Sequence, residues 1–134
     1  MTSIFSKIIQ RDIPGHIVYE DEYTIAILTI NPINPGHTLI IPKVEINHFL
    51  DVPEPFYSKV FSNAKFIGQA IHKVAKSKRI GAIIQGLEVP HFHLHLVPLN
   101  SPADMDFRNS KSPSQEELKE TCEKIKATLK EMGY

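Results

Sequence analysis

The chain has 134 residues, 42% of them hydrophobic and 22% charged, which fits a single domain (residues 1–134) with one core. Fifteen Lys and Arg residues balance fifteen Asp and Glu residues, which argues against nucleic-acid binding, and no segment reaches the ~20 apolar residues of a membrane span. The single cysteine excludes an intrachain disulfide framework and suits a reducing compartment, so we expect a soluble, cytoplasmic protein that binds neither nucleic acid nor membranes.

The first part of the chain predicts one helix followed by three strands. Residues 2–9 begin with hydroxyl side chains that cap helices, and their isoleucines have helical spacing, which is typical of a short amphipathic helix. Residues 16–20, 24–30 and 37–42 are rich in β-branched side chains and are separated by turn-type residues. This pattern favours three strands in close succession.

A long helix and two more strands are predicted next. Asp51 and Glu54 flank a proline at a plausible helix start, and apolar side chains then recur every three or four residues as far as Val74. Residues 79–85 and 91–99 have strand character, and the second segment alternates strictly.

The last part of the chain predicts a polar loop and a helix. Residues 100–114 are polar, and Ser114 and Glu117 have the spacing of a capping box. Cys122 lies on the apolar stripe that follows, where a small buried hydrophobic residue is the simplest interpretation. The element order predicts an α+β fold, a mostly antiparallel sheet with a short N-terminal, a long central and a C-terminal helix.

Three histidines alternate with apolar residues in the segment "HFHLHLV". On a strand, residues i and i+2 lie on one side about 6.6–7 Å apart, so His91, His93 and His95 would line one face while Phe92 and Leu94 enter the core. Three interpretations stay open. The strand is His-rich without a function, it holds a metal, or its imidazoles perform acid–base and nucleophilic chemistry on phosphorus.

The pattern His-φ-His-φ-His-φ-φ, with φ apolar, is the signature of the histidine triad (HIT) family, and "HFHLHLV" matches it at all seven positions. The segments "SIFSKII", "IPGHIVYEDE", "LTINPINPGHTLIIPK" and "GLEVPHFHLHLVP" resemble, in the same order, blocks of the family's Hint-like branch. The resemblance implies a HIT-like fold whose core, residues 1–100, carries the triad, with residues 101–134 adding the loop and the last helix. It also implies a homodimer whose sheet continues across both subunits.

The activity that the resemblance implies is cleavage of purine nucleoside 5′-phosphoramidates, typically of AMP, through a covalent nucleotidyl-histidine. His93 matches the nucleophile, His95 the donor to phosphate oxygens, and His91 the residue that orients the group. His37, in "PGHTL", matches a fourth active-site histidine that assists proton movement, although a turn histidine at a strand start is the alternative. This chemistry needs free imidazole nitrogens, so we expect no metal and no other cofactor.

The resemblance also implies a nucleotide pocket. Thr29 stands where the family often has an Asp that binds the ribose hydroxyls, and Glu88 stands beside the phosphate site, where its charge repels phosphate. These two departures favour the runner-up function, a nucleotide-binding regulatory protein with little turnover. The implied nucleotide-binding residues are Ile4, Phe5, Ile8, Ile27, Thr29, Ile30, Gln85, Gly86 and Val89.

Overall fold

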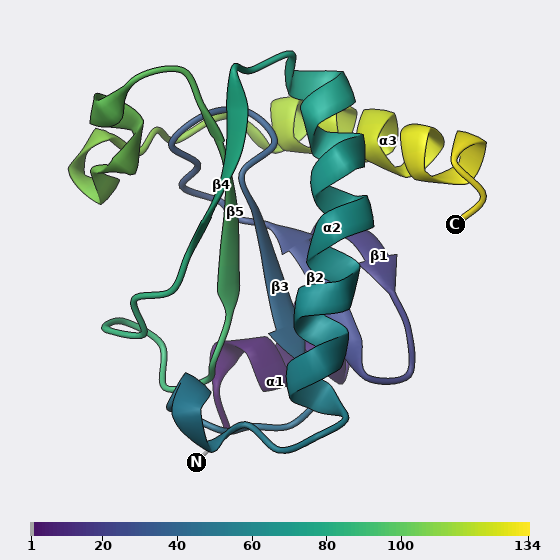
Figure 1. Ribbon diagram of the computed structural model, residues 1–134, viewed down its shortest axis with the longest axis vertical. Helices are drawn as coiled ribbons and strands as arrows, with labels where there is room; N and C mark the ends of the chain where they lie inside the picture. The colour runs from purple at the N-terminus through teal and green to yellow at the C-terminus, as the bar shows by residue number, and fades with distance from the viewer. Residues whose placement is uncertain (1) are drawn as a thin grey trace.

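The structure is a computed structural model that describes residues 2–134. Its centre is a five-stranded antiparallel sheet in the order β1-β2-β3-β5-β4, and three α-helices pack around it (Figure 1). This arrangement confirms the predicted α+β class. The elements are α1 (Ile4–Ile9), β1 (Ile17–Glu20), β2 (Thr24–Leu28), β3 (Thr38–Pro42), α2 (Phe56–Ala75), β4 (Arg79–Ile83), β5 (Leu94–Leu99) and α3 (Gln115–Glu131).

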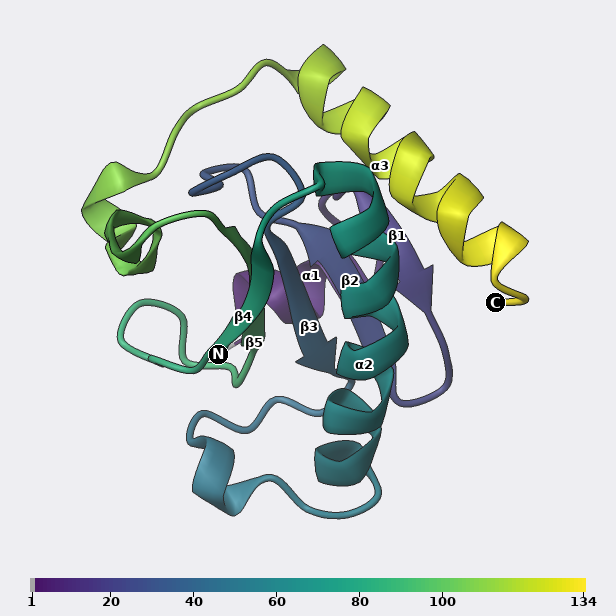
Figure 2. The same cartoon turned by 45° about the horizontal axis from the view of Figure 1, so that its top comes forward.

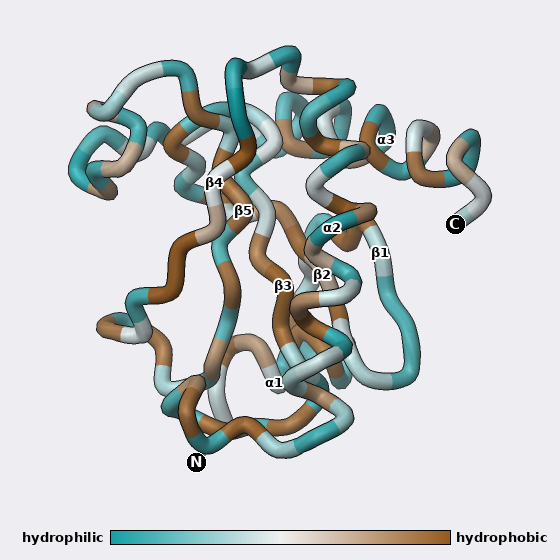
Figure 3. The backbone as a smooth tube through the Cα atoms, viewed as in Figure 1, coloured by the Kyte–Doolittle hydropathy of each residue, from teal (hydrophilic) through white to brown (hydrophobic). Residues whose placement is uncertain are grey.

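The two faces of the sheet carry different helices. Because side chains alternate along a strand, Ala26 and Leu28 of β2 pack in the larger core with α2 and α3. Ile25 and Ile27 of the same strand point the other way and pack with α1 in a smaller core. Figure 2 shows α2 and α3 on one side of the sheet and α1 behind it. Hydrophobic residues accordingly run along β2 and β3 (Figure 3), whose residues are all buried.

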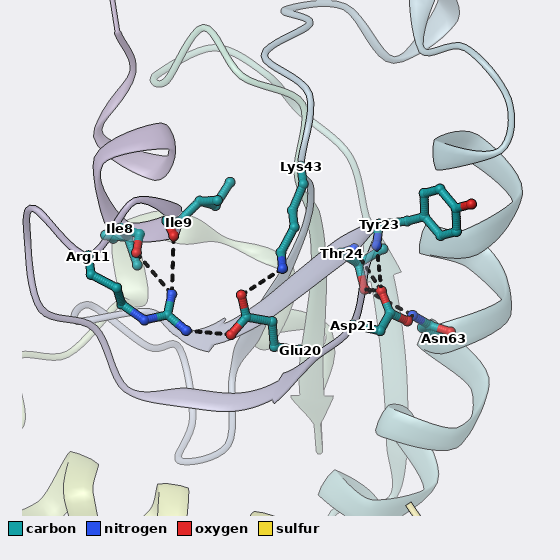
Figure 4. Close-up of polar contacts among 9 residues, drawn as sticks. All are labelled: Ile8, Ile9, Arg11, Glu20, Asp21, Tyr23, Thr24, Lys43 and Asn63. Carbon is teal, nitrogen blue, oxygen red and sulfur yellow. Dashed lines mark hydrogen bonds and ion pairs between the residues drawn. The ribbon is translucent and has the colours of Figure 1, made fainter.

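Glu20, at the end of β1, ties the sheet to the end of α1 (Figure 4). Its carboxylate lies 2.7 Å from Lys43 Nζ and also pairs with the Arg11 guanidinium. Arg11 in turn donates to the carbonyl oxygens of Ile8 and Ile9 at 3.3 Å each. These contacts satisfy carbonyls at the end of α1 and hold this helix against the sheet.

Asp21, in the β1–β2 turn, connects the sheet to α2 on the opposite face (Figure 4). Its carboxylate accepts from the backbone N–H groups of Tyr23 and Thr24 at 2.9 and 2.8 Å, and from Asn63 Nδ2 of α2 at 2.7 Å. Asn63 is buried and also donates to the Thr24 hydroxyl. The β1–β2 turn is therefore bonded directly to the long helix.

The predicted helix starts agree with the structure except at α2. Ser3 caps α1, and Ser114 and Glu117 form the expected capping box of α3. Cys122 is buried, as expected. The long helix begins only at Phe56, because residues 49–51 form a separate 3-10 helix, η1. Within residues 2–134, no helix combines the length and apolar character that crossing a membrane would need.

The predicted polar loop has the expected bounds but contains short helices, and the last predicted strand begins later than expected. The polar loop of residues 100–114 contains two 3-10 helices, η2 (Pro102–Met105) and η3 (Phe107–Asn109). The strand predicted over residues 91–99 begins only at Leu94, because its pairing with β3 ends at Ile40↔Leu94 and its pairing with β4 ends at Ile83↔His95. Two of the three triad histidines therefore precede β5.

Candidate active site

His93 lies in the extended segment just before β5, and its ring contacts α1. Its Nδ1 is 2.8 Å from the His91 carbonyl oxygen. A carbonyl can only accept, so Nδ1 carries the proton and the lone pair of the neutral ring is on Nε2. Phe5 packs edge-on against the ring with 4.8 Å between centroids. The backbone and α1 together present a fixed imidazole with a free lone pair.

A chain of hydrogen bonds sets the proton positions on the next two histidines. The backbone N–H of Ile33 donates to His37 Nδ1 at 3.1 Å, so neutral His37 carries its proton on Nε2. That nitrogen is 2.9 Å from His95 Nδ1. His95 therefore accepts at Nδ1 and carries its own proton on Nε2, which is buried and bonds to no protein atom of residues 2–134. The result is an unused donor on the histidine next to His93, with 4.9 Å between the two ring centroids.

His91 is held from both sides and is fully buried. Its Nε2 donates to the Pro42 carbonyl oxygen at 2.9 Å, so its Nδ1 accepts from the Ser3 hydroxyl at 2.7 Å. Ser3 Oγ also accepts from the Ser6 backbone N–H at 3.0 Å, which caps α1. Glu45 completes this network by accepting from the Ser3 backbone N–H and the Ser6 hydroxyl.

Burial keeps all four imidazoles neutral near pH 7. It lowers the pKa of His37 to about 4 and the pKa of His95 to about 3, and the repulsion that protonated neighbouring imidazoles would exert lowers both pKa values further. Burial also lowers the pKa values of His91 and His93. The tautomers described above are the ones that neutral rings adopt, so the site offers a lone pair on His93 and a neutral N–H on His95.

A cavity of about 560 Å³ opens beside His93 and His95 and is mainly apolar. It lies between α1 and the end of β2, and a planar aromatic ring suits its apolar walls. Seven of the predicted nucleotide-binding residues line it, namely Ile4, Phe5, Ile8, Ile27, Thr29, Ile30 and Val89.

A second cavity of about 180 Å³ also borders His95 and is lined mostly by polar side chains. His37 and Gln85 line it, and so does Phe107 of η3, whose ring is edge-on to His95 at 4.8 Å between centroids. The two cavities share Thr29, Glu88 and His95.

Comparison with known proteins identifies the domain. A model of the HIT domain matches residues 10–101. The chain belongs to the HIT domain family. An uncharacterised HIT-like protein of Borreliella burgdorferi is 37% identical over 102 residues, 71% of this chain and 73% of that protein.

Relatives of this HIT protein with a stated activity include an adenylylsulfatase of Arabidopsis thaliana, HINT3, which is 31% identical over 71% of this chain and 51% of its own. The adenosine 5′-monophosphoramidase HNT1 of Saccharomyces cerevisiae is 35% identical over 99 residues, which cover 71% of this chain and 61% of HNT1. Among solved structures, a Hit-like protein involved in cell-cycle regulation from Bartonella henselae is 30% identical, with a TM-score of 0.84 over 95% of this chain and 96% of its own. The HIT-like fold therefore extends through the loop and α3.

The remaining predicted site residues lie elsewhere. Gln85 lines the smaller, polar cavity rather than the apolar one. Gly86 is exposed, and neither of the two cavities is lined by it; its φ of 65° turns the loop before the triad. His91 lies behind the site instead of in an open row of imidazoles, because residues 91–93 leave the strand pairing and its ring is enclosed by Ser3 and Pro42.

Four further residues that line the cavities come from distant parts of the chain and were not predicted. His16 lines the apolar cavity together with Gln115, whose Oε1 is 2.8 Å from His16 Nε2. Phe107 and Ser110 line the polar cavity. No local pattern marks these four residues, because the loop and α3 reach the site only through the fold.

The histidines do not form part of a metal-binding group. Among residues 2–134, no three His, Cys, Asp or Glu side chains lie together in an arrangement that holds a metal ion. The site nitrogens instead bond to protein groups: His91 to Ser3 and Pro42, and His37 to Ile33 and His95.

Proposed function

We propose that this HIT protein hydrolyses purine nucleoside 5′-phosphoramidates of the AMP type through a covalent nucleotidyl intermediate on His93. The observation that carries the proposal is the pairing of a free lone pair on His93 Nε2 with an unused N–H on His95, beside an apolar cavity. The name of HNT1, an adenosine 5′-monophosphoramidase, supports the choice of substrate.

The proposed reaction has two steps, formation of the covalent intermediate and its hydrolysis. The His93 Nε2 lone pair attacks the α-phosphorus, and the new bond replaces the P–N bond to the leaving group, whose nitrogen takes up one proton from solvent and departs as an amine. Water then attacks the same phosphorus, the bond to His93 breaks, and a proton returns to solvent with AMP as product. His95 Nε2–H donates to the phosphoryl oxygens, where charge builds up in both steps.

His91 and His37 fix the proton positions of His93 and His95. The His91 carbonyl keeps the proton of His93 on Nδ1, and His37 keeps the proton of His95 on Nε2. Preorganised donors of this kind stabilise a transition state without reorganising during the reaction. The purine occupies the apolar cavity, and the Thr29 hydroxyl contacts the ribose.

The proposal is tested by trapping the intermediate. Enzyme quenched in acid-free conditions during turnover of an adenosine 5′-phosphoramidate should gain the mass of one AMP group, mapped to His93. His93→Ala should lose both the adduct and turnover, because no other imidazole takes its in-line position. His72→Ala is the matched control, since His72 bonds to the Ser77 carbonyl at the end of α2. An adduct on another residue, or turnover in His93→Ala, would contradict the mechanism.

A regulatory nucleotide-binding protein with little turnover is the second candidate. The observation that favours it is Glu88, an exposed acidic residue that lines both cavities beside the proposed phosphate site. If nucleotide binds but no AMP adduct forms in a single turnover, this candidate replaces the hydrolase.

A further inference from the structure

The two cavities meet at the place where phosphorus must lie under the proposed function. His93 lines the apolar cavity and His95 lines both. In an in-line displacement the leaving group departs on the side opposite the nucleophile. With the purine in the apolar cavity and His93 attacking from that side, the leaving amine is directed into the polar cavity next to His37 and His95.

The charge of that polar cavity comes from one residue. Its lining consists of amide and hydroxyl side chains, Phe107, two histidines and Glu88. Burial lowers the pKa of His37 to about 4 and of His95 to about 3, so both rings are neutral at pH 7. Glu88 is then the one lining residue with a formal charge.

Neither Arg108 nor Lys111, the cations of the adjoining loop, lines the polar cavity. Arg108 of η3 contacts Asp106 at 2.7 Å. The Lys111 ammonium donates to the Ile33 carbonyl oxygen. The negative charge of Glu88 is therefore available to a ligand in the polar cavity, while the same charge disfavours an anion there.

The segment that closes the polar cavity is separate from the part of the chain that the HIT domain model matches. That match ends at residue 101. Phe107 and Ser110, which line the polar cavity, lie beyond it. The leaving-group side of the site is thus built from the loop after β5 together with Glu88.

We propose that the polar cavity receives the leaving amine and that Glu88 selects amines bearing a second, positively charged group. This inference rests on the proposed function. The P–N bond breaks as described above, and the released product is a diamine-type or other cationic amine. Glu88 is a specificity-determining residue in this scheme and takes no part in the bond changes.

The test compares three adenosine 5′-phosphoramidates whose leaving amines have equal chain length and end in an ammonium, a methyl or a carboxylate group. Wild-type kcat/KM should be about three- to tenfold higher for the ammonium substrate than for the methyl one, as for a partly exposed ion pair, and lowest for the carboxylate. Glu88→Gln should remove the preference, and added salt should weaken it in the wild type. Glu22→Gln is the charge-matched control, because Glu22 is exposed in the β1–β2 turn, and should retain the preference.

The outcomes separate the two proposals. Turnover of all three substrates at similar rates, or a preference that persists in Glu88→Gln, overturns the role of Glu88 and leaves the phosphoramidase intact. If the wild type cleaves none of them and forms no AMP adduct, the proposed function fails and this inference fails with it.

Discussion

At the residue scale, one backbone amide decides what His95 can do. Because the Ile33 N–H donates to His37 Nδ1, the proton of neutral His37 is on Nε2. The Nε2–H of His37 then donates to His95 Nδ1. If His37 were protonated on Nδ1, the Ile33 N–H would lose its acceptor inside the protein, which is costly for a buried amide. The neutral forms of His37 and His95, with their protons on Nε2, therefore depend on the folded position of the Ile33 backbone.

This coupling predicts that the protein loses stability between pH 7 and pH 5. The folded-state pKa values of His37 and His95, about 4 and about 3, lie below the ordinary value of 6.5. Below pH 6.5 the unfolded chain binds more protons, so the free energy of unfolding falls as the pH falls. We expect a loss of about 3–4 kcal/mol at pH 5, about 2 kcal/mol from each imidazole, measured by urea unfolding.

Two variants separate this effect from general acid sensitivity. His37→Gln removes one titrating group and should flatten the pH dependence, whereas His72→Gln should leave it unchanged because His72 lies at the end of α2. Equal stability of the wild type at pH 5 and pH 7 would show that the two imidazoles are not held neutral.

The sequence predicts which histidines gather but not where their protons lie. The spacing in "HFHLHLV" correctly places Phe92 and Leu94 in the core, whereas His91 is enclosed by Ser3 and Pro42 and does not continue the row of His93 and His95. The proton positions depend on Ile33 and Pro42, whose backbone groups reach the triad only through the packing of β3 and the loop before it. No pattern along the chain contains that information.

At the scale of elements, α1 has two functions that meet in Ser3. The Ser3 hydroxyl caps the helix and donates to His91, while the helix itself carries Ile4, Phe5 and Ile8 of the apolar cavity. A six-residue helix has little stability of its own. Its cap and its contact with the sheet therefore also hold one wall of the proposed nucleotide site.

We predict that Ser3→Ala lowers both stability and turnover, and that Ser3→Thr restores them. Loss of the cap costs about 1 kcal/mol in the free energy of unfolding. Loss of the donor leaves His91 Nδ1 without its partner, which disturbs the carbonyl that orients His93, so kcat should fall as well as KM rise. Unfolding curves and steady-state kinetics measure the two effects.

Ser6→Ala serves as the control for α1, since it loses a bond to Glu45 but retains the Ser3–His91 contact. If Ser3→Ala raised KM and left kcat unchanged, the hydroxyl would matter only for holding α1 as a wall of the apolar cavity, and its bond to His91 would not affect catalysis.

The helices were easier to predict than the last strand. Capping residues and apolar spacing are local signals, and they give α1 and α3 within one or two residues. The length of β5 depends on where its neighbours stop: β3 pairs with it only as far as Leu94. The turns of the 102–111 loop are likewise stabilised by distant groups, such as the Pro32 carbonyl that accepts from the Lys111 N–H.

At the scale of the whole molecule, β4 forms an edge of the sheet. Within the described chain it pairs with β5 alone, so one row of its backbone groups is open to another strand. Such edges invite pairing with a second chain. On the neighbouring α2, Tyr57 and Phe61 are large hydrophobic side chains with 39% and 38% exposure, and their rings lie 5.1 Å apart.

These features lead to the last prediction, a two-fold symmetric dimer in which β4 pairs with its copy and α2 packs beside the axis. A two-fold axis brings the same surface of both subunits into contact. Phe61→Glu therefore places one negative charge on each subunit, and the two charges repel each other across the axis. Phe61→Glu should therefore convert a dimer at micromolar concentration into a monomer with an unchanged circular dichroism spectrum, as measured by light scattering. Met105→Glu, which alters an exposed apolar side chain on η2, should stay dimeric. A monomeric wild type would remove the interface altogether, whereas a dimeric Phe61→Glu would place it away from α2.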